Sequence, residues 1–164
     1  LNQGYQQLLT TESAELFLND IESRYQIVES SKRLGEIRLS LQIVMHTLQQ
    51  ADQLLLQRIQ DRPLCLQQKA NAQFTIVSNV FHKYYIQQVQ MYFSGLHQQA
   101  TNAFVEFDTL LAVMNVTDKN VDAFWQTVYT AENSEWALFN AAVKQHTLYW
   151  QALLEQCGKL PKLS

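Results

Sequence analysis

The sequence predicts an all-α protein, folded as an elongated antiparallel bundle of three long helices. Its 164 residues include only two prolines and four glycines, so few positions favour a turn or a loop. Apolar residues also recur every three or four positions over long stretches, which is the spacing of one face of a helix. A chain of this length predicts a single domain spanning residues 1–164.

The first long helix is expected over residues 11–60. Its apolar positions form two stripes, Ala14, Phe17, Ile21, Tyr25, Val28 and then Leu34, Ile37, Leu41, Val44, Leu48, Ala51, Leu55. The two stripes are out of phase across the polar residues 29–33, which indicates a kink or a break. A break there would make the bundle four-helical. Pro63 ends the segment, because proline disfavours helical geometry in the residue before it.

The second helix is expected over residues 64–115, where the apolar positions alternate in steps of four and three. This stripe consists of His82, Ile86, Val89, Phe93, Leu96, Ala100, Ala103, Phe107, Leu110 and Met114. It passes Gly95 without a change of phase, so we predict an unbroken helix through that glycine.

The third helix is expected over residues 118–157, with Asp118 as its N-cap. Its stripe holds Trp125, Tyr129, Glu132, Trp136, Phe139, Val143, His146, Trp150, Leu153 and Cys157, and so includes every tryptophan of the protein. Gly158 and Pro161 follow as stop signals.

Charge and hydropathy exclude two classes of partner. The net charge is −3 and only 16% of residues are charged, and no cluster of Lys and Arg is available to neutralise phosphates, so we expect no nucleic-acid binding. No apolar run approaches the length of a membrane span, so no membrane insertion by this segment is expected. Because the sequence begins at Leu1, we expect that a signal peptide or an anchor has been removed from it.

The helices lack the residue spacings that metal and cofactor chemistry requires. No Glu is followed by a His three residues later, as a di-iron bundle needs, and the His-Glu-x-x-His pattern of zinc peptidases is absent. We therefore predict no catalytic residue, no metal and no cofactor, and a protein that is not an enzyme. Of the histidines, His82 and His146 are expected in the core and His46 and His97 in solvent.

Cys65 and Cys157 permit one disulfide, and the sequence leaves their pairing open. A hairpin folded at residues 116 and 117 puts Cys157 opposite residue 76, about 16 Å from Cys65 along the helix axis. A disulfide requires Cα atoms within about 7 Å. The bond therefore forms only if the chain kinks or its tail runs on past Cys157.

The tryptophan stripe suggests either a core seam or a binding surface. Trp136 and Trp150 lie deep in the third helix and are expected in the core. Trp125 lies near the helix start and is expected to be the exposed one. Trp125, Tyr129 and Glu132 are therefore the candidate partner-binding residues.

These observations favour a non-enzymatic protein-interaction module that binds a protein partner or a second copy of itself, as coiled-coil-like bundles do. An extracytoplasmic accessory, adaptor or immunity-type protein, periplasmic or secreted, has this size, charge and cysteine content, with the cytoplasm as the alternative location. The alternative function is a ligand-sensing helical bundle of a membrane receptor.

Overall fold

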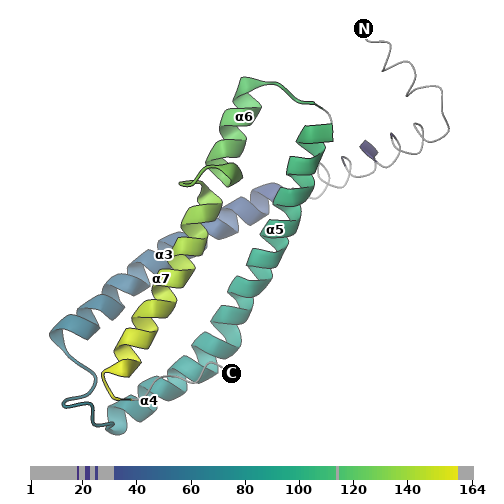
Figure 1. Cartoon of the computed structure of the whole chain (residues 1–164). Coiled ribbons are helices and arrows are strands. Elements are labelled where there is room, and N and C mark those ends of the chain that lie inside the picture. The colour runs from purple at the N-terminus through teal and green to yellow at the C-terminus, as the bar shows by residue number, and fades with distance from the viewer. Residues whose placement is uncertain (1–17, 19–20, 23–24, 26–31, 114, 159–164) are drawn as a thin grey trace.

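A computed structural model describes residues 18, 21–22, 25, 32–113 and 115–158, and these residues form helices and connecting turns without a strand. Figure 1 shows an elongated bundle in which long helical segments run side by side. In chain order the elements are α3 (Arg33–Asp61), α4 (Ala72–Val80), the π-helix η1 (Phe81–Val89), α5 (Gln90–Val113), α6 (Lys119–Trp125), the π-helix η2 (Gln126–Thr130) and α7 (Glu135–Glu155). The predicted all-α bundle is confirmed.

Helix α3 is amphipathic in the way its stripe predicts. Ile37, Leu41, Val44 and Leu48 are buried in the core. The helix begins after Lys32, which has a left-handed backbone with φ of 47°. The polar run at residues 29–33 therefore marks the start of α3, whereas most of the predicted helix before it lies outside the described residues.

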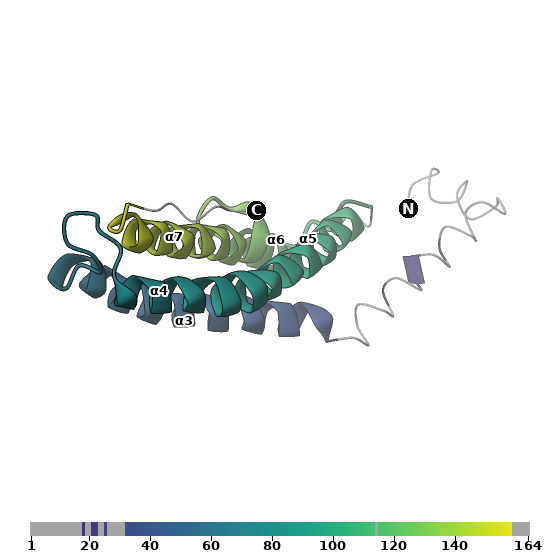
Figure 2. The ribbon, with the colours of Figure 1, turned by 90° about the horizontal axis from the view of Figure 1, so that it is seen from below.

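The loop of residues 62–71 corrects the predicted start of the second helix. That helix begins at Ala72 and not at residue 64, because Asn71 caps it by accepting a hydrogen bond from the backbone N–H of Phe74 at 2.8 Å. Gln67 and Gln68 have left-handed backbones and turn the loop back on itself. Figures 1 and 2 show the loop at the end of the bundle where α7 also ends.

A disulfide joins Cys65 in this loop to Cys157, just beyond α7, with their Cα atoms 5.0 Å apart. The wide separation expected from an ideal hairpin is wrong, because Cys65 precedes the helix and lies in a loop that folds back over the bundle end. Gln156 strengthens the same junction, since its side-chain oxygen accepts from the backbone N–H of Leu64 and its amide donates to the carbonyl of Ile59.

Elements α4, η1 and α5 form one continuous helical segment through Gly95, as predicted. The π-helix shifts the phase of the segment, because each of its turns holds more residues than an α-helical turn. Phe81 and Tyr85 are therefore the fully buried residues of the π-helix, whereas Ile86 is half-buried against the core. The expected core position of His82 is wrong, and its side chain is exposed.

The third segment is interrupted, which corrects the single helix predicted over residues 118–157. Asp118 caps α6 as expected, accepting from the backbone N–H groups of Asn120 and Val121. After η2 the chain leaves helical geometry at Ala131, and α7 starts afresh with Ser134 as its N-cap. The hydroxyl of Ser134 donates to the carbonyl of Tyr129 and accepts from the N–H of Ala137, so it ties the two pieces together.

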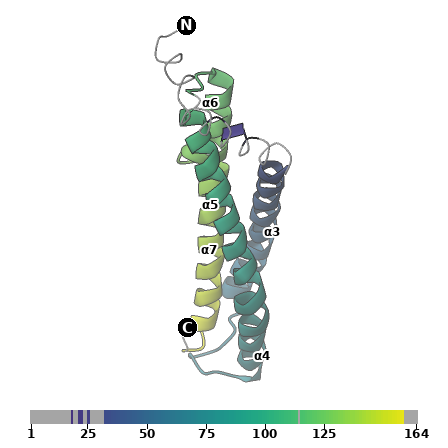
Figure 3. The ribbon, with the colours of Figure 1, turned by 90° about the vertical axis from the view of Figure 1, so that its right-hand side faces the viewer.

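Helices α3 and α7 are parallel neighbours, and α5 runs in the opposite direction beside them (Figures 1 and 3). Polar side chains also join α3 to α7. Arg38 and Gln42 both donate to Glu135, and Asp52 pairs with His146. Large side chains, among them Phe81, Phe104, Phe139 and Trp150, fill the space between α7 and the η1–α5 segment.

Candidate functional site

An apolar groove lies between α3 and the η1–α5 segment, with a volume of about 600 Å³. We call it the α3–η1 groove. Large hydrophobic side chains that line it from both walls are exposed to solvent, namely Ile43, Leu54, Val80, Tyr84 and Tyr92, with exposed fractions from 42% to 69%. Apolar surface of this kind is costly to leave in water, so the groove is the strongest candidate for a binding site.

The floor of the groove includes a buried polar chain that joins two helices. The imidazole of His146 on α7 is paired through Nδ1 with the carboxylate of Asp52 on α3. The indole Nε1 of Trp150 donates to His146 Nε2 at 3.1 Å. Both ring nitrogens of His146 are thus satisfied within the protein, and the ring itself is buried.

Tyr85 from η1 completes this floor. Its ring meets the edge of the His146 ring, with centroids 5.2 Å apart, and its hydroxyl is 3.0 Å from the hydroxyl of Thr147. Burial raises the pKa of the Tyr85 phenol above its ordinary value, and the hydrogen bond to Thr147 opposes that rise. The polar groups of the floor therefore bond to one another, and the groove presents mainly carbon to a ligand.

A second cavity, of about 490 Å³, lies between α5 and α7. Its lining is more polar and includes Gln90, Ser94, His97, Asn140 and Lys144. The rings of His97 and Trp136 meet at its edge with centroids 4.7 Å apart. His97 is exposed, as is His46, which pairs with Gln50. Both histidines therefore lie in solvent as the sequence predicts.

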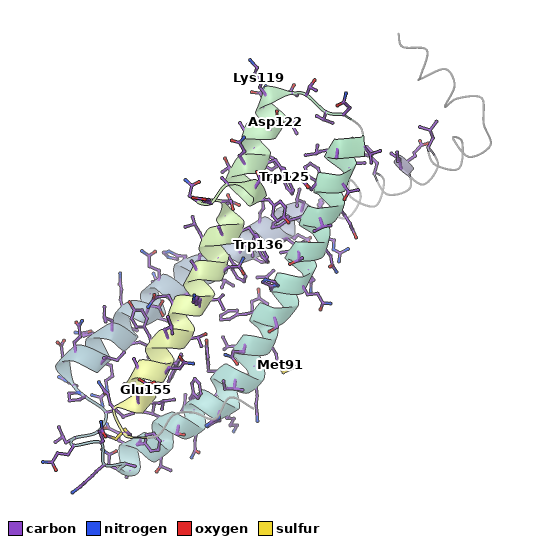
Figure 4. All side chains as sticks on the ribbon, viewed as in Figure 1. Met91, Lys119, Asp122, Trp125, Trp136 and Glu155 are labelled. Atoms are coloured by element: carbon purple, nitrogen blue, oxygen red, sulfur yellow. A yellow bond between two sulfur atoms is a disulfide. The ribbon has the colours of Figure 1, made fainter. Side chains whose placement is uncertain are left out.

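The residues predicted to meet a partner do not form one exposed surface. Trp125 is only 4% exposed, so the expectation that it is the exposed tryptophan is wrong. It packs against Phe107 and Tyr129, and its indole N–H donates to Asp108 at 2.8 Å, which satisfies its polar atom in the core. Glu132 is exposed at the turn before α7. Figure 4 shows Trp125 and Trp136 on the side of their segment that faces α5.

Trp136 and Trp150 are half-buried, and of these two Trp150 lines the α3–η1 groove. The sequence missed Asp52 as the partner of His146. A signal was present, because Asp52 follows Ala51 on the core stripe of α3 and so lies at the edge of the buried face. The expected core position of His146 is confirmed.

Within the described part of the chain, no group of three His, Cys, Asp or Glu residues is placed to hold a metal ion. Nor is any described helix long and apolar enough to cross a membrane. What the described residues offer is the apolar groove and its internally bonded floor.

Comparison with known proteins identifies the chain at the level of its family alone. No curated protein and no solved structure matches it. One family model matches residues 2–161, a range that includes the α3–η1 groove and almost all of the chain before α3. The chain therefore belongs to the family described as "Protein of unknown function (DUF3080)".

Proposed function

We propose that this protein is a non-enzymatic interaction module that binds an amphipathic helix in the α3–η1 groove. The observation that carries the proposal is the row of exposed apolar side chains on both walls of the groove. Helix-in-groove recognition uses this arrangement, in which apolar residues of the bound helix at positions i, i+3, i+4 and i+7 enter an apolar channel.

The dimensions of the groove suit a helical occupant. Its α3 wall extends from Ile43 to Leu55, which is about 18 Å at 1.5 Å per residue and corresponds to between three and four helical turns. The rim carries Tyr84 and Tyr92, and tyrosine is enriched at protein interfaces because it combines a large apolar ring with a polar end.

A volume of about 600 Å³ is also in the range of small-molecule pockets, which favours the ligand-sensing alternative. Such pockets orient their ligands through a few unsatisfied polar groups. Here the nitrogens of His146 and the indole of Trp150 are already bonded within the protein. The chemistry of the floor therefore supports apolar side chains of a helix better than a polar small ligand.

An extracytoplasmic location, periplasmic or secreted, belongs to the same proposal. It is supported by the Cys65–Cys157 disulfide, because such bonds persist in oxidising compartments and are rare in the cytosol.

Site-specific photo-crosslinking in cells of the source organism tests the proposal. A photoreactive amino acid at Leu54, on the groove wall, is expected to give one discrete protein adduct. The same group at Leu138, an exposed leucine of α7 outside the groove lining, is the matched control and is expected to give none. A Tyr84→Asp substitution on the opposite wall should abolish the Leu54 adduct. Equal adducts from both positions, or an adduct unaffected by Tyr84→Asp, would contradict the proposal.

A further inference from the structure

We infer that the second cavity, between α5 and α7, is a binding site for a small organic anion, a carboxylate attached to an elongated apolar body. We call it the α5–α7 cavity. Its volume of about 490 Å³ is in the range of small-molecule pockets. The site goes beyond the proposed function, which uses the α3–η1 groove alone.

The α5–α7 cavity has an apolar floor and a polar rim. Four residues from one face of α5 and four from α7 line it. On α5 they are Gln90, Phe93, Ser94 and His97, and on α7 they are Phe139, Asn140, Val143 and Lys144. Phe93 and Phe139 are buried between the helices and form the floor, whereas Ser94, His97 and Lys144 are exposed at the rim. A ligand with an apolar body and a polar end fits this arrangement.

Polar groups of the rim are left for a ligand to bind. Within the part of the chain that the structure describes, the Ser94 hydroxyl, the His97 ring nitrogens and the Lys144 ammonium form no hydrogen bond and no ion pair. In the α3–η1 groove, by contrast, the nitrogens of His146 are bonded within the protein. A few free polar groups around an apolar floor are what orients a small ligand in its pocket.

The charge of the lining favours an anion. Lys144 is the one lysine of the lining, which contains no Asp, Glu or Arg. The acidic residues of α7 are Glu135 and Glu155 at its two ends, and those of α5 are Glu106 and Asp108 in its C-terminal half. A ligand carboxylate would therefore reach the ammonium without competition from a protein carboxylate, and hydrogen bonds between charged groups are stronger than neutral ones.

The register of the two helices indicates an elongated ligand. The ring of His97 contacts Trp136, with centroids 4.7 Å apart, and the hydroxyl of Tyr85 lies 3.0 Å from that of Thr147. His97 is therefore at the Trp136 end of the cavity and Lys144 at the Thr147 end. Between Trp136 and Lys144 helix α7 rises by about 12 Å, at 1.5 Å per residue. A carboxylate held by Lys144 leaves room for an apolar body that extends over the floor toward His97.

Calorimetric titration of the purified protein with 4-phenylbutyrate tests the inference. This probe carries a carboxylate at one end and a phenyl ring at the other. We expect saturable binding of one molecule per chain. The uncharged analogue 4-phenylbutanamide should bind about fivefold more weakly, because it cannot form an ion pair with Lys144 and the pair is partly exposed to solvent. Equal binding of the acid and the amide, or no saturable binding of the acid, would overturn the inference.

Removing the lysine charge provides a second measurement. Lys144→Gln should weaken the binding of 4-phenylbutyrate about fivefold and leave that of the amide unchanged. Lys119→Gln is the matched control, because it removes the same charge from an exposed position at the start of α6, outside the lining. If the two variants bind the acid equally well, the assignment of the anion to Lys144 is wrong.

Filling the cavity tests its location. Ser94→Trp puts an indole at an exposed position of the rim and should abolish the binding of 4-phenylbutyrate. Gln99→Trp adds the same group at an exposed position of α5 that lines neither cavity, and should leave the binding unchanged. Far-ultraviolet circular dichroism checks that both variants keep their helical content.

Tyr84→Asp, which is expected to block the α3–η1 groove, distinguishes this site from the groove. Binding of 4-phenylbutyrate that survives Tyr84→Asp and is lost in Ser94→Trp supports the α5–α7 cavity. Binding that is lost in Tyr84→Asp and retained in Ser94→Trp would assign the probe to the groove and overturn the inference. Neither result changes the partner adduct expected at Leu54, so the proposed function and this inference can fail separately.

Discussion

The hydrogen bonds of His146 determine which of its nitrogens carries a proton. The indole of Trp150 can only donate, so His146 Nε2 must accept and holds a lone pair. The proton is therefore on Nδ1, where Asp52 accepts it. Asp52 thus holds the neutral imidazole in one orientation, and the imidazole in turn positions Trp150 at the groove floor.

Removing the carboxylate of Asp52 should leave the Nδ1–H of His146 buried without an acceptor. We expect Asp52→Ala to lower the free energy of unfolding by about 1 to 3 kcal/mol, which is the cost of a buried unsatisfied donor. Urea denaturation measures the change. Gln49→Ala, at an exposed position of the same helix, is the control and should have almost no effect. An equal loss in both variants would mean that the Asp52–His146 pair contributes nothing.

The environment of Glu135 should make the folding stability of the protein depend on pH. Two hydrogen bonds from Arg38, at 2.6 and 2.8 Å, lower the pKa of the Glu135 carboxyl below its ordinary value of 4.5. The folded state then favours the carboxylate, so the stabilisation is present above pH 4.5 and is lost as the pH falls through the lowered pKa. Unfolding measured between pH 7 and pH 3 should show this loss in the natural protein, and the Glu135→Gln variant should lose less over the same interval.

At the level of helices, Gly95 tests the continuity of the second segment. A Cβ atom built on Gly95 would have no neighbour within 4 Å, and its φ is not positive. Because glycine within a helix costs about 0.5 to 1 kcal/mol relative to alanine, we expect Gly95→Ala to stabilise the protein by that amount. Thermal unfolding checks the sign, and a loss of stability would indicate that the helix bends at Gly95.

The three tryptophans report on how the third segment packs. Trp125 is 4% exposed, whereas Trp136 and Trp150 are half-buried. Acrylamide quenching of single-tryptophan variants should therefore be weakest for Trp125. Stronger quenching at Trp125 than at the other two would place this residue outside the core.

The helical faces could be predicted from apolar spacing wherever the helix is regular. The buried positions of α3 from Ile37 to Leu48 follow the spacing without exception. The π-helices could not be predicted this way, because apolar periodicity assumes a constant number of residues per turn. For this reason the sequence placed His82 in the core where Phe81 lies. The α3–η1 groove could not be predicted from apolar spacing either, because it depends on the distance between two helices.

At the scale of the whole molecule, two sequence observations were enough to predict a bundle of three long helical segments. They are the lengths of the apolar stripes and the scarcity of proline and glycine. The loop of residues 62–71 could not be predicted from the sequence, because its residues with left-handed backbones are glutamines, which do not signal a turn. The turn before Ser134 was hidden by Trp136, which continues the stripe of Trp125 and Tyr129 across it. Long-range pairs such as Asp52 with His146 depend on the register between helices, and apolar spacing leaves that register undetermined.

The disulfide should contribute strongly to the stability of the bundle. It closes a loop with a sequence separation of 92, and cross-links over loops of this size reduce the entropy of the unfolded chain. We expect the double variant Cys65→Ser, Cys157→Ser to be less stable by about 2 to 5 kcal/mol in urea denaturation. Equal stability of the oxidised and reduced natural protein would contradict this expectation.

The covalent ring closed by Cys65 and Cys157 also determines how the protein would respond to tension. Every described element from α4 to α7 lies inside the ring, and of the long described helices α3 alone lies outside it. A force applied to the two chain ends could peel α3 away, but the ring could not lengthen while the sulfur–sulfur bond is intact. The ring stores about 300 Å of chain, given a separation of 92 residues and about 3.3 Å per extended residue, and reduction alone would release it.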